Sequence, residues 1–282
     1  MRHNLALATL AVMIAAVALL TSCSKEESNF TPTSNTSWRG NVKSIVDAQV
    51  AVASSTATAK KNGWGCAGAD AVGALSGAAA GYELIPHWGA AVVGGIIGGV
   101  GASVSYWNRM GQPTGNGPWD PYGPNPYDPR NPYSYAGILH NEICLAAIQD
   151  PDMFDSEGRL NMERLNTLGM EIISRRSSDF EALQGIELHD PIQSMDFHPV
   201  YDKINSTIDN GDYVLSSANS DINWFCTEFQ RGLSSCSSPE DIRSYVSKLD
   251  EAILSSDLPE ETKGSMLMSL SVLENSTLFW YE

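Results

Sequence analysis

Glycine recurs every four residues along two neighbouring stretches of this chain, and few folds can use that pattern. The two series are Gly73, Gly77, Gly81 and Gly94, Gly98. At 3.6 residues per turn, residues four apart lie on one helix face, so each series predicts a strip without side chains. A glycine inside a helix costs about 1 kcal/mol relative to alanine. Close contact between two helix backbones offsets that cost, so we expect the two strips to face each other.

The two glycine series predict a helical hairpin over residues 64–107, with Pro86 in the turn between its arms. Residues 89 to 107 carry no charge over 19 positions, close to the roughly 20 that cross a bilayer. Asp70 is the one acid of the first arm, and we expect it to cap the start of that helix. The pattern favours membrane insertion or self-association. The alternative is a small-residue core inside a soluble part of the protein.

Near the start of the chain, the basic residue Arg2 is followed by an uncharged apolar run over residues 5–20. This pattern is typical of a secretory signal, and the run is short for a membrane span. The residues Leu20-Thr21-Ser22-Cys23 that follow resemble the lipobox of bacterial lipoproteins. This resemblance implies that residues 1–22 are a signal peptide and that Cys23 is lipidated. The alternative is an ordinary signal peptide with a chance cysteine.

Directly after Cys23, the residues Lys25, Glu26 and Glu27 resemble the export signal of Bacteroidota-type surface lipoproteins. That likeness implies a lipid-anchored protein of the outer membrane that is exposed on the cell surface. The alternative is a generic polar tether. Residues 23–37 are rich in Ser, Thr and Asn, lack the apolar side chains of a core, and are interpreted as a flexible tether.

The charge of the expected mature chain excludes some partners. Only Arg2 is charged before Cys23, so 16 basic residues (17 less one) face 33 acidic ones, and the net charge is −17 (16 less 33). Such a charge disfavours nucleic acid and anionic lipid headgroups as partners and favours solubility. We therefore expect no nucleic-acid partner.

Two further resemblances rest on the glycine-rich stretch, about 45 of the 282 residues. Repeated small-residue strips after a lipobox look like the glycine-zipper lipoproteins of Gram-negative envelopes, a structural class. The line GWGCAGADAVGALSGAAAG, followed by a proline turn and VVGGIIGGVGAS, also resembles the mature segment of class II bacteriocins, which perturb membranes. The chain departs from the bacteriocin pattern because it carries a lipobox instead of a double-glycine leader and continues into a long domain.

Beyond the hairpin the chain divides again by composition. Residues 38–110 form an N-terminal region, and residues 111–133 alternate Pro, Gly and Asn with aromatics, which predicts a semi-extended linker that holds two parts apart. Residues 134–282 show apolar residues at helical spacing and nothing that alternates like a strand for long. The sequence therefore predicts an all-α fold: the hairpin, then a domain of about six helices without an extended sheet.

The six predicted helices of residues 134–282 have the following marks. The stripes are Leu139, Ile143, Ala147; Met162, Leu165, Gly169, Ile172; Ile204, Ile208; Ile222, Phe225, Phe229; and Ile242, Tyr245, Val246, Leu249, Ile253. The fifth stripe follows Ser238-Pro239, a capping serine and a proline at the first helical position. The sixth helix is expected to open at Leu258-Pro259 and to end in the run Thr277-Leu278-Phe279-Trp280-Tyr281.

Catalytic and metal-binding candidates are few. His140 and Cys144 lie four apart on one helix face, as a nucleophile and its base would, but no oxyanion group or third partner is identifiable. We interpret them as a core thiol beside a polar boundary histidine. The acidic run 150–158 fails the calcium-loop spacing and is interpreted as a solvated loop. We assign no catalytic residue, cofactor or metal site, and we do not expect an enzyme.

Four cysteines remain after Cys23, namely Cys66, Cys144, Cys226 and Cys236, and their spacing matches no metal site. A disulfide between the last two and free buried thiols are both open. Taken together, we expect a lipid-anchored envelope protein with a structural or interaction role, whose hairpin associates with membrane or with copies of itself. The alternative is a membrane-active, bacteriocin-like effector carried on a helical domain. The protein partner of the helical domain stays unidentified.

Overall fold

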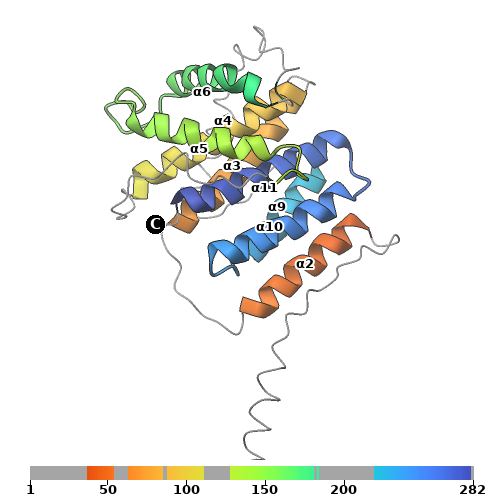
Figure 1. The fold of residues 1–282 in the computed structure, drawn as a ribbon. Helices are drawn as coiled ribbons and strands as arrows, with labels where there is room; N and C mark the ends of the chain where they lie inside the picture. The colour runs from red at the N-terminus through yellow and green to blue at the C-terminus, as the bar shows by residue number, and fades with distance from the viewer. Residues whose placement is uncertain are drawn as a thin grey trace, which may run out of the picture. The chain divides into compact units, whose positions relative to one another are not determined.

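The computed structural model describes residues 37–53, 63–84, 88–110, 128–180, 183 and 219–280. Over these residues the chain forms eight α-helices and one short 3₁₀-helix (Figure 1). They are α2 (Trp38–Ala53), α3 (Gly63–Leu84), α4 (Trp88–Met110), α5 (Ser134–Gln149), α6 (Met162–Arg176), η1 (Ser177–Asp179), α9 (Ser220–Leu233), α10 (Pro239–Leu254) and α11 (Glu260–Trp280). The described residues contain no strand, only an isolated bridge between Phe154 and Leu160. The expected all-α class is confirmed for this part of the chain.

The apolar stripes read from the sequence mark the buried faces of four helices. The stripes of α5, α6, α9 and α10 are buried, whereas the stripe of Ile204 and Ile208 lies outside the described residues. Ser238 caps α10 as expected, because its side chain accepts from the amide of Asp241 and Pro239 follows at the first position. Asn161 and Asn219 cap α6 and α9 in the same way.

The glycine strips lie at the contact between α3 and α4. A Cβ atom on Gly77 would lie well inside van der Waals distance of the Gly94 carbonyl oxygen, and one on Gly81 would meet the Ala90 carbonyl. A Cβ on Gly73 would likewise meet the Gly98 carbonyl. These are backbone atoms and cannot rotate away, so no residue larger than glycine fits without moving the two helices apart.

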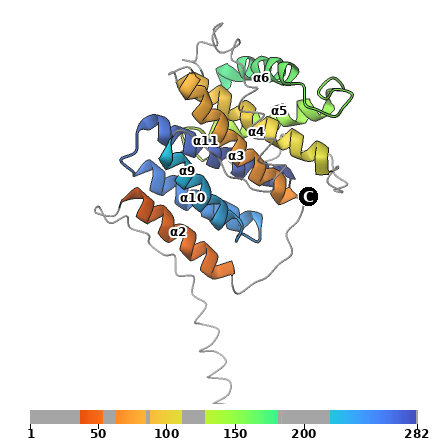
Figure 2. The same cartoon turned by 180° about the vertical axis from the view of Figure 1, so that it is seen from behind.

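A second row of small residues on α4 faces the rest of the unit. A Cβ on Gly95 would meet the Met268 sulfur of α11, and one on Gly99 would lie 3.0 Å from His140 Cδ2 of α5. Apart from α4, α11 is the helix with the most extensive contact to α3, and it also packs on α5 and α10 (Figure 2). The α3–α4 hairpin therefore lies among the helices of the C-terminal half.

Residues 36–282 form one compact unit, and this differs from the expectation that a linker over 111–133 keeps two parts separate. The difference has a physical reason: α3 and α4 present faces made mostly of small and apolar residues, and α11, α5 and α6 cover them. Residues 111–127 of the linker lie outside the described residues. Asn131, at its end, is buried and donates from Nδ2 to the Leu267 carbonyl of α11 at 2.9 Å.

One segment among the described helices, Gly89–Arg109, is long and apolar enough to cross a membrane, and 94% of its most apolar window is buried inside the unit. A core helix of a soluble protein has the same length and composition. The arrangement within residues 36–282 corresponds to the packed-core alternative for the hairpin, because its apolar faces are covered by the chain's own helices.

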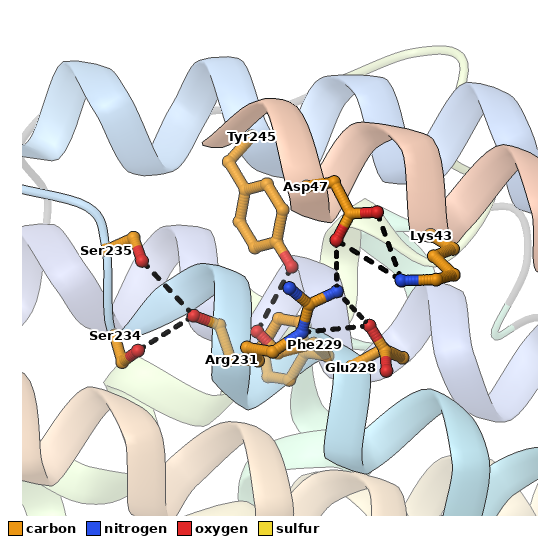
Figure 3. A network of polar contacts seen from close by, with 8 residues as sticks. All are labelled: Lys43, Asp47, Glu228, Phe229, Arg231, Ser234, Ser235 and Tyr245. Carbon is orange, nitrogen blue, oxygen red and sulfur yellow. Dashed lines mark hydrogen bonds and ion pairs between the residues drawn. The ribbon is translucent and has the colours of Figure 1, made fainter. Parts of the chain in front are cut away.

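Helix α2 packs on α9 and α10 through one apolar face, and ion pairs join it to α9. Val42, Ile45 and Val46 are buried in that contact. At its edge, Asp47 accepts from Lys43 Nζ at 3.0 Å and from Arg231 Nη2 of α9 at 2.6 Å (Figure 3). These side chains are about half exposed, so burial of the apolar face, rather than the ion pairs, holds α2 in place.

We predict that Gly77→Ala destabilises residues 36–282 by about 1–3 kcal/mol, because the added methyl group forces two backbones apart. Gly68→Ala is the matched control on the same helix, since its Cβ would make only an ordinary contact at 3.9 Å with Leu233. That control should be neutral or stabilising by up to about 1 kcal/mol from helix propensity. Urea unfolding followed by circular dichroism measures both changes. Equal effects of the two substitutions would contradict the close-contact role.

Candidate functional site: a buried polar cluster around Asp70

Several residues singled out from the sequence lie outside the described part of the chain. These are the expected lipidation site Cys23 and the expected export residues Lys25, Glu26 and Glu27. The packing glycines are described and lie between α3 and α4. Within the described residues, polar side chains gather where α3, α4, α5 and α11 meet. We call this set the Asp70 cluster; it comprises Asp70, Ser103, His140, Cys144, Ser276 and Trp280.

Asp70 is completely buried in the centre of the cluster. Ser276 Oγ and Trp280 Nε1 of α11 both donate to its Oδ2 atom, the latter at 2.9 Å. The expectation that Asp70 caps a helix is wrong, because α3 begins at Gly63 and Asp70 lies two turns inside it. Its second oxygen, Oδ1, has no hydrogen-bond partner among the described groups. Asp70 thus ties α3 to the C-terminal helix instead of closing the start of its own.

His140 and Cys144 of α5 complete the cluster. His140 Nε2 lies 3.7 Å from Asp70 Oδ2 and 3.5 Å from Cys144 Sγ. Nδ1 lies 3.1 Å from Asn141 Oδ1, whose amide is oriented because its Nδ2 donates to the Asn275 carbonyl. Since that oxygen only accepts, a neutral ring carries its hydrogen on Nδ1, and Nε2 accepts from the thiol. His140 is fully buried, so its expected place at the polar boundary is wrong.

Burial governs the electrostatics of the cluster. It raises the pKa of Asp70, while the nearby His140 acts in the opposite direction. Burial also raises the pKa of the Cys144 and Cys66 thiols, and the charge of Asp70 adds to both shifts. Both thiols therefore stay protonated at neutral pH, and a protonated thiol is a poor nucleophile. In this arrangement neither His140 nor Cys144 is accessible to a substrate.

Two pairs of residues that can bind metal ions lie one helical turn apart: Cys66 and Asp70 on α3, and His140 and Cys144 on α5. Even so, no three His, Cys, Asp or Glu side chains of the described residues converge as a metal ion requires. All four cysteines after Cys23 are free and buried in the structure. The hydrogen bonds from Ser276 and Trp280 to Asp70 make the cluster a contact between α3 and α11.

The acidic run 150–158 uses its carboxylates locally. Asp150 accepts from the Asp152 amide at 2.9 Å and from Arg164 Nε at 2.7 Å. Asp155 accepts from the amide and the guanidinium of Arg159. Gly158 has a φ of 77°, which explains a glycine at that point of the turn. The segment forms a loop before α6, in agreement with the sequence interpretation.

Sequence reasoning did not find the partners of Asp70, because Ser276 and Trp280 lie more than 200 residues along the chain. It also did not find a second buried acid, Asp250 of α10, which accepts from Asn131 Nδ2 at 3.1 Å. For Asp70, one feature of the sequence could have indicated that such partners exist. A lone acid in the middle of an uncharged helix must find donors or a proton when that helix is buried.

No protein-family model, curated protein or solved structure matches this chain. The sequence and the geometry of the described residues therefore carry the functional argument.

We predict that Ser276→Ala costs about 1.5–3 kcal/mol of unfolding free energy, because it removes a hydroxyl that donates to a buried carboxyl group. Ser265→Ala is the matched control on the same helix, since Ser265 donates only to the carbonyl of Glu261 one turn earlier. Its cost should stay below about 0.5 kcal/mol. Thermal and urea unfolding of residues 36–282 compare the two variants. Similar losses in both would show that Asp70 does not depend on the α11 hydroxyl.

Proposed function

We propose that this protein is a lipid-anchored protein of the cell envelope, displayed on the outer membrane, with a structural or interaction role. The observation that carries this proposal is Cys23 in register behind an apolar run, in a sequence that resembles a lipobox. Lys25, Glu26 and Glu27 follow at the place of the surface export signal that they resemble. The acidic composition of the remaining chain fits a soluble body outside the membrane.

In this proposal the lipid on Cys23, and not the hairpin, attaches the resting protein to the membrane. The arrangement of residues 36–282 supports that division, because the glycine strips are already occupied by each other and the apolar faces of α4 are covered. A single acyl chain gives marginal membrane binding, whereas the several chains of a lipidated cysteine anchor a protein stably. The helical unit is then free to meet a partner in the surrounding medium.

A second candidate function is a membrane-active effector similar to class II bacteriocins, carried on the helical unit. The observation that favours it is the segment Gly89–Arg109, which has the length and composition of a membrane span and is kept from water by the surrounding helices. In that case the unit 36–282 acts as a soluble carrier for a membrane-seeking hairpin.

Lipidation is tested by radiolabelled palmitate in cells that express the full chain. We expect label in the wild type and its loss in Cys23→Ala, because the acyl chains require that side chain. Cys66→Ala is the control, since it removes a buried cysteine of the helical unit and should leave the label in place. Label that persists in Cys23→Ala would overturn the lipid anchor.

Surface display is tested by adding protease to intact cells. We expect the wild type to be shaved from the surface, and replacement of Lys25, Glu26 and Glu27 by neutral residues to protect it. A periplasmic protein that stays intact in the same cells shows that the outer membrane is closed. If intact cells protect the wild type, the protein faces the periplasm, while the anchor itself is still supported by the palmitate result.

A further inference from the structure

Three carboxyl groups that are largely shielded from water lie on or next to α11, the helix that covers the hairpin. Asp70 approaches from α3, Asp250 approaches from α10, and Glu274 belongs to α11 itself. Most of α11 is buried, including the residues that face the hairpin. Ser269 Oγ donates to the Ala71 carbonyl of α3 at 2.7 Å, and Met268 lies against Gly95 of α4. The same helix therefore meets both the hairpin and the three acids.

Around Asp250 and Glu274, negative groups come close together with few positive partners. Asp250 is 3% exposed and faces Glu274 of α11 and Asp128, which precedes α5. The positive groups that face this pair are Arg130 and, from α10, Arg243. Arg130 is largely engaged with Asp128, to which it donates from Nε and Nη2, and it also donates to Ser247 of α10. Asn131 donates to Asp250 and to the Leu267 carbonyl, so its side chain bridges this acid and α11.

On the other side of α11, the groups that face Asp70 come from four helices. His140 and Cys144 belong to α5, Cys66 to α3, Ser103 to α4, and Ser276 and Trp280 to α11. Burial opposes a negative charge on Asp70 more strongly than His140, Ser103, Ser276 and Trp280 together favour it.

Ionisation of these acids works against the packing of α11. Burial raises the pKa of Asp70 and holds the pKa of Asp250 well above its usual range, with Glu274 and Asp128 adding to the latter shift. Burial also raises the pKa of Glu274 from an ordinary value of 4.5 to about 7, against the opposing effect of Arg243. The folded unit thus keeps protons at pH values where the unfolded chain has lost them. The contribution of Glu274 to the stability of the folded unit is therefore present in acid. It is lost as the pH rises from about 4.5, the ordinary pKa, through about 7, the pKa in the folded unit.

We propose that α11 is a pH-sensitive strap over the α3–α4 hairpin: it lies firmly in place while the surrounding acids carry protons, and it loosens and uncovers the hairpin as they ionise. Loosening exposes Gly95, which lies against Met268 of α11, while the contact of Gly77 with Gly94 inside the hairpin is unaffected. The strap goes beyond the proposed envelope function, because it does not depend on the lipid at Cys23.

The test is hydrogen exchange of residues 36–282 measured by mass spectrometry from about pH 5 to about pH 8, with rates corrected for the intrinsic effect of pH. Protection of α11 peptides should fall by about tenfold or more over this range, as linkage to Glu274 requires. Peptides of α6, which packs away from the three acids, should keep their protection. An apolar dye should brighten in parallel with the loss at α11.

Two variants identify the acids responsible. Glu274→Gln, alone or with Asp250→Asn, should flatten the pH dependence of α11 because neutral amides cannot ionise. Glu251→Gln is the matched control, since it removes an exposed acid of α10 and should leave the dependence intact. If protection of α11 does not change or rises with pH, or if α6 loses protection in step with α11, the strap is wrong.

A covalent lock keeps the test decisive if the glutamine variant fails to fold. The double variant Gly95→Cys, Met268→Cys introduces one thiol on α4 and one on α11. The two positions face each other, because a Cβ atom on Gly95 would meet the Met268 sulfur, so the two cysteines are placed to form a disulfide. The oxidised form should hold α11 on α4 and abolish the pH dependence of its exchange, and reduction should restore it. Unchanged pH dependence in the locked form would overturn the proposal. The palmitate label at Cys23 is independent of either result.

Discussion

The contact between the backbones of α3 and α4 is the constraint on which the rest of this structure depends. Gly77 packs directly against Gly94, and no side chain stands between the two helices at that point. Each helical glycine is unfavourable by itself, so the pattern is stable only when both strips are paired. Pairing them within one chain also makes the hairpin thin, because two helices without side chains between them occupy little space. Other helices can then cover most of its surface.

The thin hairpin determines how the remaining helices pack. Because Gly95 and Gly99 have no side chains, α11 and α5 approach α4 closely as well. The same closeness brings polar groups into the interior, since α11 carries several serines toward its neighbours. Ser269 and Ser276 satisfy backbone and carboxyl groups of α3, which joins the end of the described chain to the hairpin. In this way α11 serves both as the cover of the hairpin and as the principal partner of its buried acid.

The parts of this fold that could be predicted from the sequence are those set by interactions between residues close together in the chain. Helices such as α10 were predictable because their signals are local: Ser238 lies next to Pro239, and the apolar residues recur every turn. The glycine spacing likewise predicted two strips, and the structure places them opposite each other. What covers the hairpin was not predictable, because α11 contacts α3 across some 200 residues and no local pattern encodes that pairing. The misplacement of Asp70 and His140 has the same origin, since each was assigned from its own helix alone.

The central claim is that the glycine strips are closed within one chain and need neither a membrane nor a second copy. Sedimentation velocity of residues 36–282 in buffer without detergent tests it most directly. The account predicts one soluble species with the mass of a monomer, because every strip finds its partner in the same hairpin. Oligomers that persist on dilution, or a protein that stays in solution only with detergent, would show that the strips pair between chains or within lipid, and would contradict this account.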